Sequence, residues 1–76
     1  MVGNDALLNR LRALGFSFKR QTERVAIYKQ KGKTRRVTVS KRNAHDANYV
    51  RIVLRMAGMS PDEIEAFIQE TDHTHH

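Results

Sequence analysis

The stretch "RVAIYKQKGKTRRVTVSKR", residues 24–42, decides the fold predicted for this chain. Val25 and Ile27 alternate with other residues before a glycine, and Val37 and Val39 do so after it. An alternation of period two with β-branched residues is typical of half-buried antiparallel strands. The glycine between the two runs supplies a tight turn, so the stretch is predicted to form a β-hairpin.

A further strand is predicted upstream, in "FSFKRQ" at residues 16–21, with a short link to the hairpin near Gln21 to Glu23. The three strands are expected to form one antiparallel sheet with an apolar inner face and a basic outer face. The expected inner face carries Phe16, Phe18, Val25, Ile27, Val37 and Val39. The expected outer face carries Lys19, Arg24, Tyr28, Thr34, Arg36 and Thr38.

Two helices are predicted on either side of these strands in the sequence. Leucines recur with the spacing of one helical face between a cap at Asn4 or Asp5 and a stop at Gly15. Apolar residues repeat in the same way from Val50 to Ala57. Both helices are therefore expected to bury one stripe against the inner face of the sheet.

A third, short helix is predicted from the segment "SPDE", residues 60–63. Ser60 fits an N-cap, Pro61 fits the first helical position and Glu63 completes a capping box. The element order is then α-β-β-β-α plus a short C-terminal helix. The fold class is α+β, a three-stranded antiparallel sheet with two helices packed on one face.

The length of 76 residues predicts a single domain, with an ordered core over about residues 4–70 and a flexible tail or tag remnant at 71–76. The absence of cysteine excludes disulfides and thiolate metal sites. Apolar runs are too short for a membrane span and the start lacks the core of a secretory signal, so a cytoplasmic location is expected. No cofactor is expected, and the histidines at 73, 75 and 76 are not expected to form a functional metal site.

The charge is distributed unevenly along the chain. The net charge is +6, and all 14 Lys and Arg lie within residues 1–60 beside three acids. Residues 61–76 hold five acids and no Lys or Arg. This asymmetry indicates a polyanionic partner for the basic part, and the alternative is a basic surface that serves only solubility.

The basic hairpin is the predicted contact surface for such a partner, because clustered Lys and Arg release counterions from a phosphate backbone. Tyr28 either stacks on an unpaired base or packs against its cross-strand neighbours. The predicted nucleic-acid-binding residues are Lys19, Arg24, Tyr28, Lys31, Lys33, Arg36, Lys41 and Arg42.

His45 is the one histidine outside the C-terminal tail, and it is the sole candidate catalytic residue. One interpretation makes it a general acid or base that the neighbouring Asp46 carboxylate orients. The other, which we favour, makes it a solvent-exposed loop residue or part of the following helix cap.

The segments "LNRLRALGFSFKRQ", "RRVTVS" and "YVRIVLRMAGMSPDEI" resemble the HicA (YcfA-like) toxins of bacterial toxin–antitoxin systems. The resemblance covers roughly residues 5–68. It implies a fold like that of double-stranded-RNA-binding domains, the cleavage or inactivation of mRNA, and neutralisation by a HicB antitoxin.

The chain departs from the HicA pattern at the residue on which catalysis depends. The family carries its catalytic histidine in a Gly-Ser-His-type motif at the start of the second strand, where this chain reads "TERV", Thr22 to Val25. Valine has no ionisable group, and the preceding Arg24 stays protonated near neutral pH. The resemblance therefore implies the fold and RNA affinity but not the nuclease chemistry.

Three functions remain open from the sequence. The leading one is a HicA-like RNA-binding protein of a toxin–antitoxin system, and the second is an active mRNA interferase, a metal-independent endoribonuclease that uses His45. The third is a protein-interaction module, either covered by a HicB-like antitoxin or self-associating through Ile52, Met56 and Met59 as a weak dimer. No membrane partner is expected, and the electrostatic term alone does not distinguish RNA from DNA.

Overall fold

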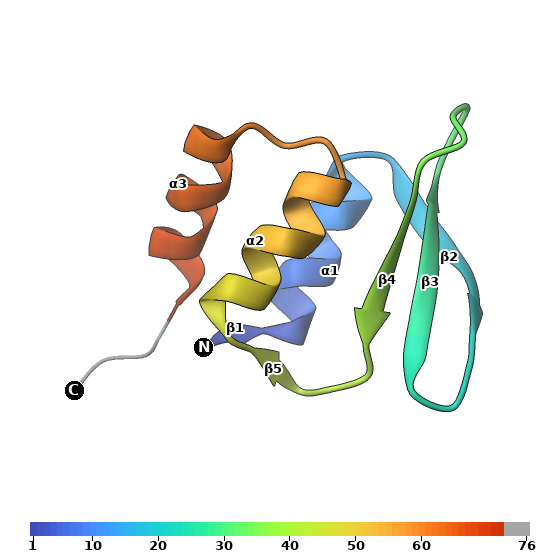
Figure 1. Cartoon of the computed structure of the whole chain (residues 1–76), viewed down its shortest axis with the longest axis horizontal. Helices are drawn as coiled ribbons and strands as arrows, with labels where there is room; N and C mark the ends of the chain where they lie inside the picture. Colours follow the sequence, from blue (N-terminus) through green and yellow to red (C-terminus); the bar gives the residue numbers. More distant parts are fainter. Residues whose placement is uncertain (73–76) are drawn as a thin grey trace.

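The computed structural model of the chain describes residues 1–72, which form two small sheets and three helices (Figure 1). The predicted tail or tag remnant beyond Asp72, with its three histidines, lies outside the described residues. The elements are β1 (Val2–Gly3), α1 (Asn4–Ala13), β2 (Phe16–Gln21), β3 (Val25–Gln30), β4 (Arg36–Ser40), β5 (Ala44–His45), α2 (Ala47–Met56) and α3 (Pro61–Thr71).

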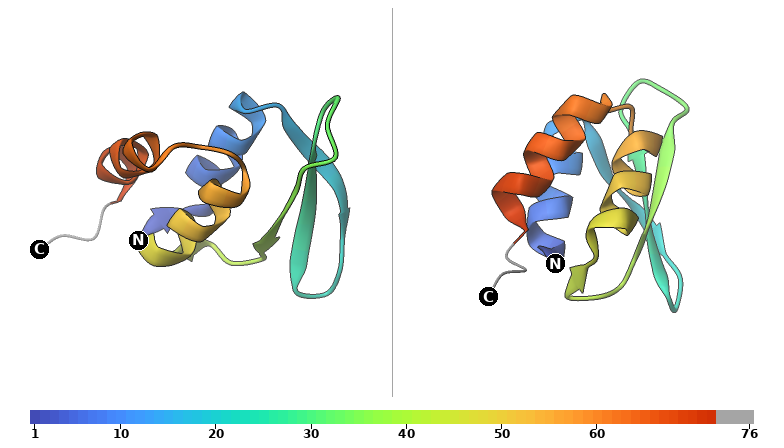
Figure 2. Two further views of the ribbon diagram at one scale, coloured as in Figure 1. Left: turned by 45° about the horizontal axis from the view of Figure 1, so that its top comes forward. Right: turned by 60° about the vertical axis from the view of Figure 1, so that its left-hand side comes forward.

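The architecture has three layers, and the predicted α+β class is confirmed. Strands β2, β3 and β4 form an antiparallel sheet in that order. Helices α1 and α2 cover one face of the sheet, and α3 lies on the side of this helix pair that is farther from the sheet (Figure 2). Within the described residues, no helix covers the opposite face of the sheet (Figure 2).

Strand β3 presents the opposite faces to those predicted from its alternation. Tyr28 is only 7% exposed, and it pairs with Phe18 on one side and Val37 on the other. Paired residues of neighbouring strands share a face, so Tyr28 points toward the helices with the buried Val37. Val25 and Ile27 therefore lie on the outer face, and their predicted places in the core were wrong.

Strand β2 forms an edge of the sheet, and this explains a second departure from the prediction. Phe16 is buried as expected, but Phe18 is 55% exposed. The Phe18 ring packs edge-on against Tyr28, with the centroids 5.8 Å apart, and it has no strand on its other side. A β-bulge follows between Phe18 and Arg20, so Lys19 is an extra residue in this strand.

The core lies between the sheet and the helices and continues under α3. The α2 and α3 stripes predicted from the sequence are buried, and Met59, predicted to support self-association, is buried with them at 8% exposure. The buried apolar residues are Val2, Leu7, Leu11, Phe16, Tyr28, Val37, Val39, Val50, Val53, Leu54, Ala57, Met59, Ile64, Phe67 and Ile68.

The two short strands β1 and β5 were not predicted, and they extend the packed region beyond residues 4–70. Val2 is completely buried, pairs with His45, and forms an isolated bridge with Asp72. This ribbon joins the start of the chain to the segment that precedes α2 and to the end of α3. Two-residue strands are too short to carry a periodic pattern from which they could be predicted.

The predicted start of α3 is confirmed, the predicted start of α1 is wrong, and the cap of α2 was not predicted. Asp46 caps α2 by accepting hydrogen bonds from the backbone N–H groups of Asn48 and Tyr49. The capping box at Ser60 is present as predicted. The N-cap of α1 is Gly3, which has no side-chain cap, so the predicted cap at Asn4 or Asp5 was wrong.

The observed orientation of β3 can be tested by truncating one side chain on each of its faces. Replacing Tyr28 by Ala removes a buried ring and is expected to cost about 3 kcal/mol of unfolding free energy. Replacing Ile27 by Ala on the outer face is the matched control and is expected to cost about 1 kcal/mol. Denaturant unfolding measures both values, and a larger loss for Ile27→Ala than for Tyr28→Ala would contradict the observed orientation.

Candidate nucleic-acid interface

The outer face of the sheet gathers cations from all three strands. In one row across the sheet, Lys29 pairs with Ser17 on β2 and with Arg36 on β4. Because these partners share a face, Lys29 and Arg36 stand side by side on the side that carries no helix. Ile27 of β3 pairs with Arg20 of β2, so the Arg20 side chain lies on the same outer face.

The bulge in β2 brings a fourth cation to this face. It sets Lys19 and Arg20 opposite a single residue of β3, so these consecutive side chains crowd the same region. The positive charges of Arg36, Lys29 and Arg20 all lower the pKa of Lys19, with Arg36 the strongest of these neighbours. Hereafter the basic face means Lys19, Arg20, Lys29 and Arg36.

The charges of the basic face are not neutralised within the described chain. Among residues 1–72, Arg51 is the only Lys or Arg whose side chain forms an ion pair with a carboxylate. Its Nε donates to Oε2 of Glu65 at 2.6 Å, on the α2–α3 side of the molecule. Unpaired like charges on one face repel each other, and an anionic ligand relieves that repulsion.

The structure divides the other predicted binding residues between the two ends of the sheet. Arg24, Lys41 and Arg42 line a depression where β3 begins and β4 ends, together with Glu23. Lys41 also donates from Nζ to the backbone oxygen of Thr22, 3.2 Å away. Two more predicted residues, Lys31 and Lys33, are exposed in the turn that joins β3 to β4.

Two binding-surface predictions need correction because the faces of β3 were reversed. Tyr28 is buried, so it does not present its ring to a base on the outer face. Lys29 was missed for the same reason, since it alternates with Tyr28. Arg20 was missed because the bulge, which has no sequence pattern of its own, changes the alternation after Phe18.

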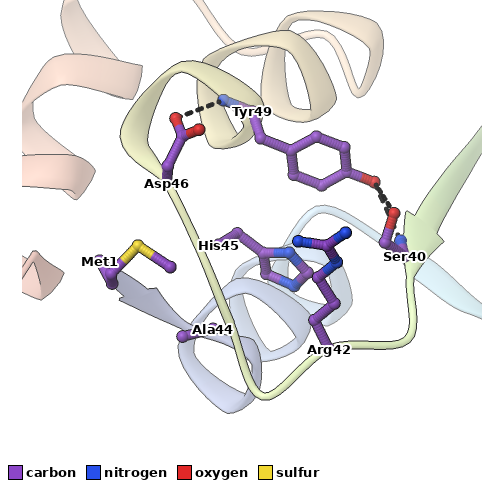
Figure 3. A pocket seen from close by; sticks show the side chains of 7 residues that line it. All are labelled: Met1, Ser40, Arg42, Ala44, His45, Asp46 and Tyr49. Atoms are coloured by element: carbon purple, nitrogen blue, oxygen red, sulfur yellow. Dashed lines mark hydrogen bonds between the residues drawn. The ribbon is translucent and has the colours of Figure 1, made fainter.

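His45 lies in a pocket beside the N-terminus of α2 and not in an exposed loop (Figure 3). Its side chain is buried, with the residue 3% exposed, and its Nε2 donates to Oδ1 of Asn4 at 2.9 Å. Its ring stacks on Tyr49 at a centroid distance of 5.1 Å. The Asp46 carboxylate caps α2, so the predicted orientation of His45 by Asp46 was wrong.

The pocket around His45 encloses about 340 Å³ and combines a cation with several hydrogen-bonding groups. The Tyr49 hydroxyl accepts from the backbone N–H of Ser40 at 2.9 Å and donates to its Oγ at 3.2 Å. Burial, and secondarily the charge of Arg42, lower the pKa of His45, which favours its neutral form. The lining residues are Met1, Ser40, Arg42, Ala44, His45, Asp46 and Tyr49.

An apolar groove runs between α2 and α3, away from the sheet. Ile52 and Pro61 contribute to its walls, and Ile52 is 59% exposed. Met56 is also exposed on α2, so two of the three residues predicted to support self-association are accessible. In residues 1–72, no helix is long and apolar enough to cross a membrane, and no three His, Cys, Asp or Glu residues cluster as metal ligands.

Comparison with known proteins identifies no relative of this chain. No family model, no curated protein and no solved structure matches it. The HicA resemblance therefore remains an expectation that depends on three short segments of the sequence.

The burial of His45 predicts a specific pH dependence of stability. The folded pKa lies below the unfolded value of about 6.5, so acidification protonates the unfolded chain first. The free energy of unfolding is expected to fall as the pH drops from about 6.5 through the folded pKa, and to lose no more from this group below it. Denaturant unfolding between pH 7.5 and 5 measures the effect.

The control for this pH dependence removes the titration of the other three histidines. The background protein carries Asn at positions 73, 75 and 76, so that His45 alone titrates as a histidine. A second protein adds His45→Gln, whose amide can donate to Asn4 without titrating. Equal pH profiles for the two proteins would show that His45 does not contribute.

Proposed function

We propose that this chain is a HicA-like RNA-binding protein of a toxin–antitoxin system, which binds RNA through the basic face. The single observation that carries the proposal is the gathering of Lys19, Arg20, Lys29 and Arg36 on the open side of the sheet without a carboxylate partner within residues 1–72. Phosphate groups would supply the missing negative charge and release their condensed counterions.

The chemistry of the outer face also suits the uncharged parts of a nucleic acid. Val25 and Ile27 are half-buried on this face, between the charged side chains. Thr38 lies opposite Ile27 and is exposed, so its hydroxyl is available to sugar or phosphate oxygens. The Lys and Arg side chains near these residues can follow the phosphate backbone of a bound nucleic acid.

The basic face would also suit an acidic protein partner. In the family that the sequence resembles, a HicB antitoxin neutralises the toxin, and we propose a HicB-like protein as the partner that competes with RNA for this face. Opposite charges would steer the two proteins together, and their association would weaken with salt. The exposed Ile52 and Met56 on α2 lie away from this surface and are available for weak self-association.

Cleavage of RNA by His45 is the second candidate function. The observation in its favour is a buried, neutral imidazole in a pocket that also contains Arg42. The Asp46 carboxylate, however, is bound to backbone N–H groups of α2 and does not assist His45. Val25 still stands in place of the family's histidine, so we propose RNA binding as the function and leave no catalytic residue assigned.

Removal of two cations from the basic face tests the proposed function. Fluorescence anisotropy measures binding of a labelled single-stranded RNA over a range of salt concentrations. The double variant Lys29→Ala/Arg36→Ala is expected to bind more weakly than the unmodified protein. The slope of log K against log salt should become shallower by about 1.4, since each phosphate contact of a single strand contributes about 0.7.

A charge-matched variant provides the control for this experiment. The double variant Arg12→Ala/Arg55→Ala lowers the net charge by the same amount, but both residues are exposed on helices. It should retain most of the affinity and the original salt slope. Equal losses in the two double variants would show that the total charge, and not the basic face, determines binding.

A further inference from the structure

We infer that the His45 pocket is a ribose–phosphate subsite, in which one ribonucleotide donates its 2′-hydroxyl to His45 and places its 3′-phosphate on Arg42. The inference rests on the proposed RNA binding and adds to it the recognition of RNA in preference to DNA. It is carried by the hydrogen-bonding state of His45, the unpaired charge of Arg42, and the continuity of the pocket with the basic surface.

The hydrogen bond between His45 and Asn4 determines which ring nitrogen is left for a ligand. Oδ1 of Asn4 is a carboxamide oxygen and only accepts, so Nε2 of His45 must carry the proton. In a neutral imidazole, Nδ1 is then an acceptor. Within residues 1–72, Oε1 of Gln30 is the only fully buried side-chain nitrogen or oxygen without a partner, so Nδ1 of His45 is open to the pocket, and no described residue donates to it. A hydroxyl group that donates is the chemical partner this nitrogen lacks.

Arg42 supplies the complementary half of the subsite. Its guanidinium lies beside the His45 ring in the pocket (Figure 3). It forms neither an ion pair nor a side-chain hydrogen bond with any residue in the described range. A guanidinium has five N–H donors and binds phosphate oxygens in pairs. The 2′-hydroxyl and the 3′-phosphate are attached to neighbouring carbons of one ribose, so a single nucleotide presents both groups together.

The carboxylate of Asp46 also lines the pocket, and its placement is compatible with an anionic ligand. It accepts from the N–H groups of Asn48 and Tyr49 at the start of α2, and Figure 3 shows it on the opposite side of the pocket from Arg42. Those two N–H groups therefore satisfy its charge in part, and the helix N-terminus stabilises it further.

The pocket is continuous with the surface proposed to bind RNA. Ser40 and Arg42 line both this pocket and the neighbouring depression that contains Arg24 and Lys41. The depression begins where β3 begins, at one end of the basic face. A strand bound across the sheet can therefore reach His45 along a path of unpaired cations.

The 2′-hydroxyl distinguishes RNA from DNA at this subsite. A deoxyribonucleotide would place a C–H group against Nδ1, so the hydrogen bond to this acceptor would be lost. The expected preference for RNA over DNA of the same sequence is about two- to tenfold, the contribution of one net hydrogen bond.

Ligand substitution tests the inference with the unmodified protein. Anisotropy at fixed salt compares a single-stranded RNA with the DNA and the 2′-O-methyl RNA of equivalent sequence. The RNA should bind about two- to tenfold more tightly than either analogue, because neither can donate from the 2′ position. Equal binding of all three ligands would overturn the subsite.

Nuclear magnetic resonance tests whether the 2′-hydroxyl of a ribonucleotide binds at His45. Uridine 3′-monophosphate is the probe, and its 2′-deoxy analogue is the control. The ribonucleotide should shift the Nδ1 resonance of His45 in the direction of an accepted hydrogen bond, and the deoxy analogue should not. Equal shifts with both nucleotides, or shifts confined to residues outside the pocket, would overturn the assignment.

Two variants separate this inference from the proposed function. Arg42→Gln should weaken RNA and DNA to a similar extent, whereas His45→Phe should abolish the preference for RNA and retain the stacking on Tyr49. Should His45→Phe fail to fold, the ligand comparisons decide alone. Equal affinity for RNA and DNA, with Lys29→Ala/Arg36→Ala still impaired, would overturn the subsite but leave the proposed function intact. No RNA binding by the unmodified protein would overturn both.

Discussion

The burial of Tyr28 against Val37 and Phe18 is the constraint on which the rest of the surface depends. It turns one face of β3 toward the helices, and the alternation of the strand then places Lys29 on the opposite side. The antiparallel register aligns Arg36 with Lys29, and the bulge in β2 adds further cations beside them. A basic face therefore follows from the packing of one aromatic ring.

The helices could be predicted from sequence more securely than the faces of the sheet. The leucine spacing of α1, the apolar stripe of α2 and the capping box of α3 are local patterns, and they appear in the structure at the expected places. The segment "VAIYKQ" is different, because it has apolar residues at both odd and even positions. Neighbouring strands decide its orientation: Val37 and Val39 are buried, and the β3 residues paired with them must share their face.

The candidate site was only partly predictable, for a related reason. The concentration of Lys and Arg around the hairpin is visible in the sequence, but the face on which each side chain lies is not. The environment of His45 depends on Asn4, which is 41 residues away in sequence, and on a two-residue ribbon without a periodic pattern. Such contacts arise from tertiary packing, so the sequence favours an exposed loop position for His45, which is buried in the structure. The structure instead couples His45 to the start of α1.

We propose above all that RNA binds to the side of the sheet that carries no helix. The most direct measurement is a titration of the isotope-labelled protein with single-stranded RNA, followed by the backbone amide resonances. We expect the perturbed amides to lie in β2, β3 and β4 and to continue through residues 40–45 to the pocket. Perturbations centred on Ile52 and Met56 in α2, with the amides of the sheet unchanged, would contradict the claim.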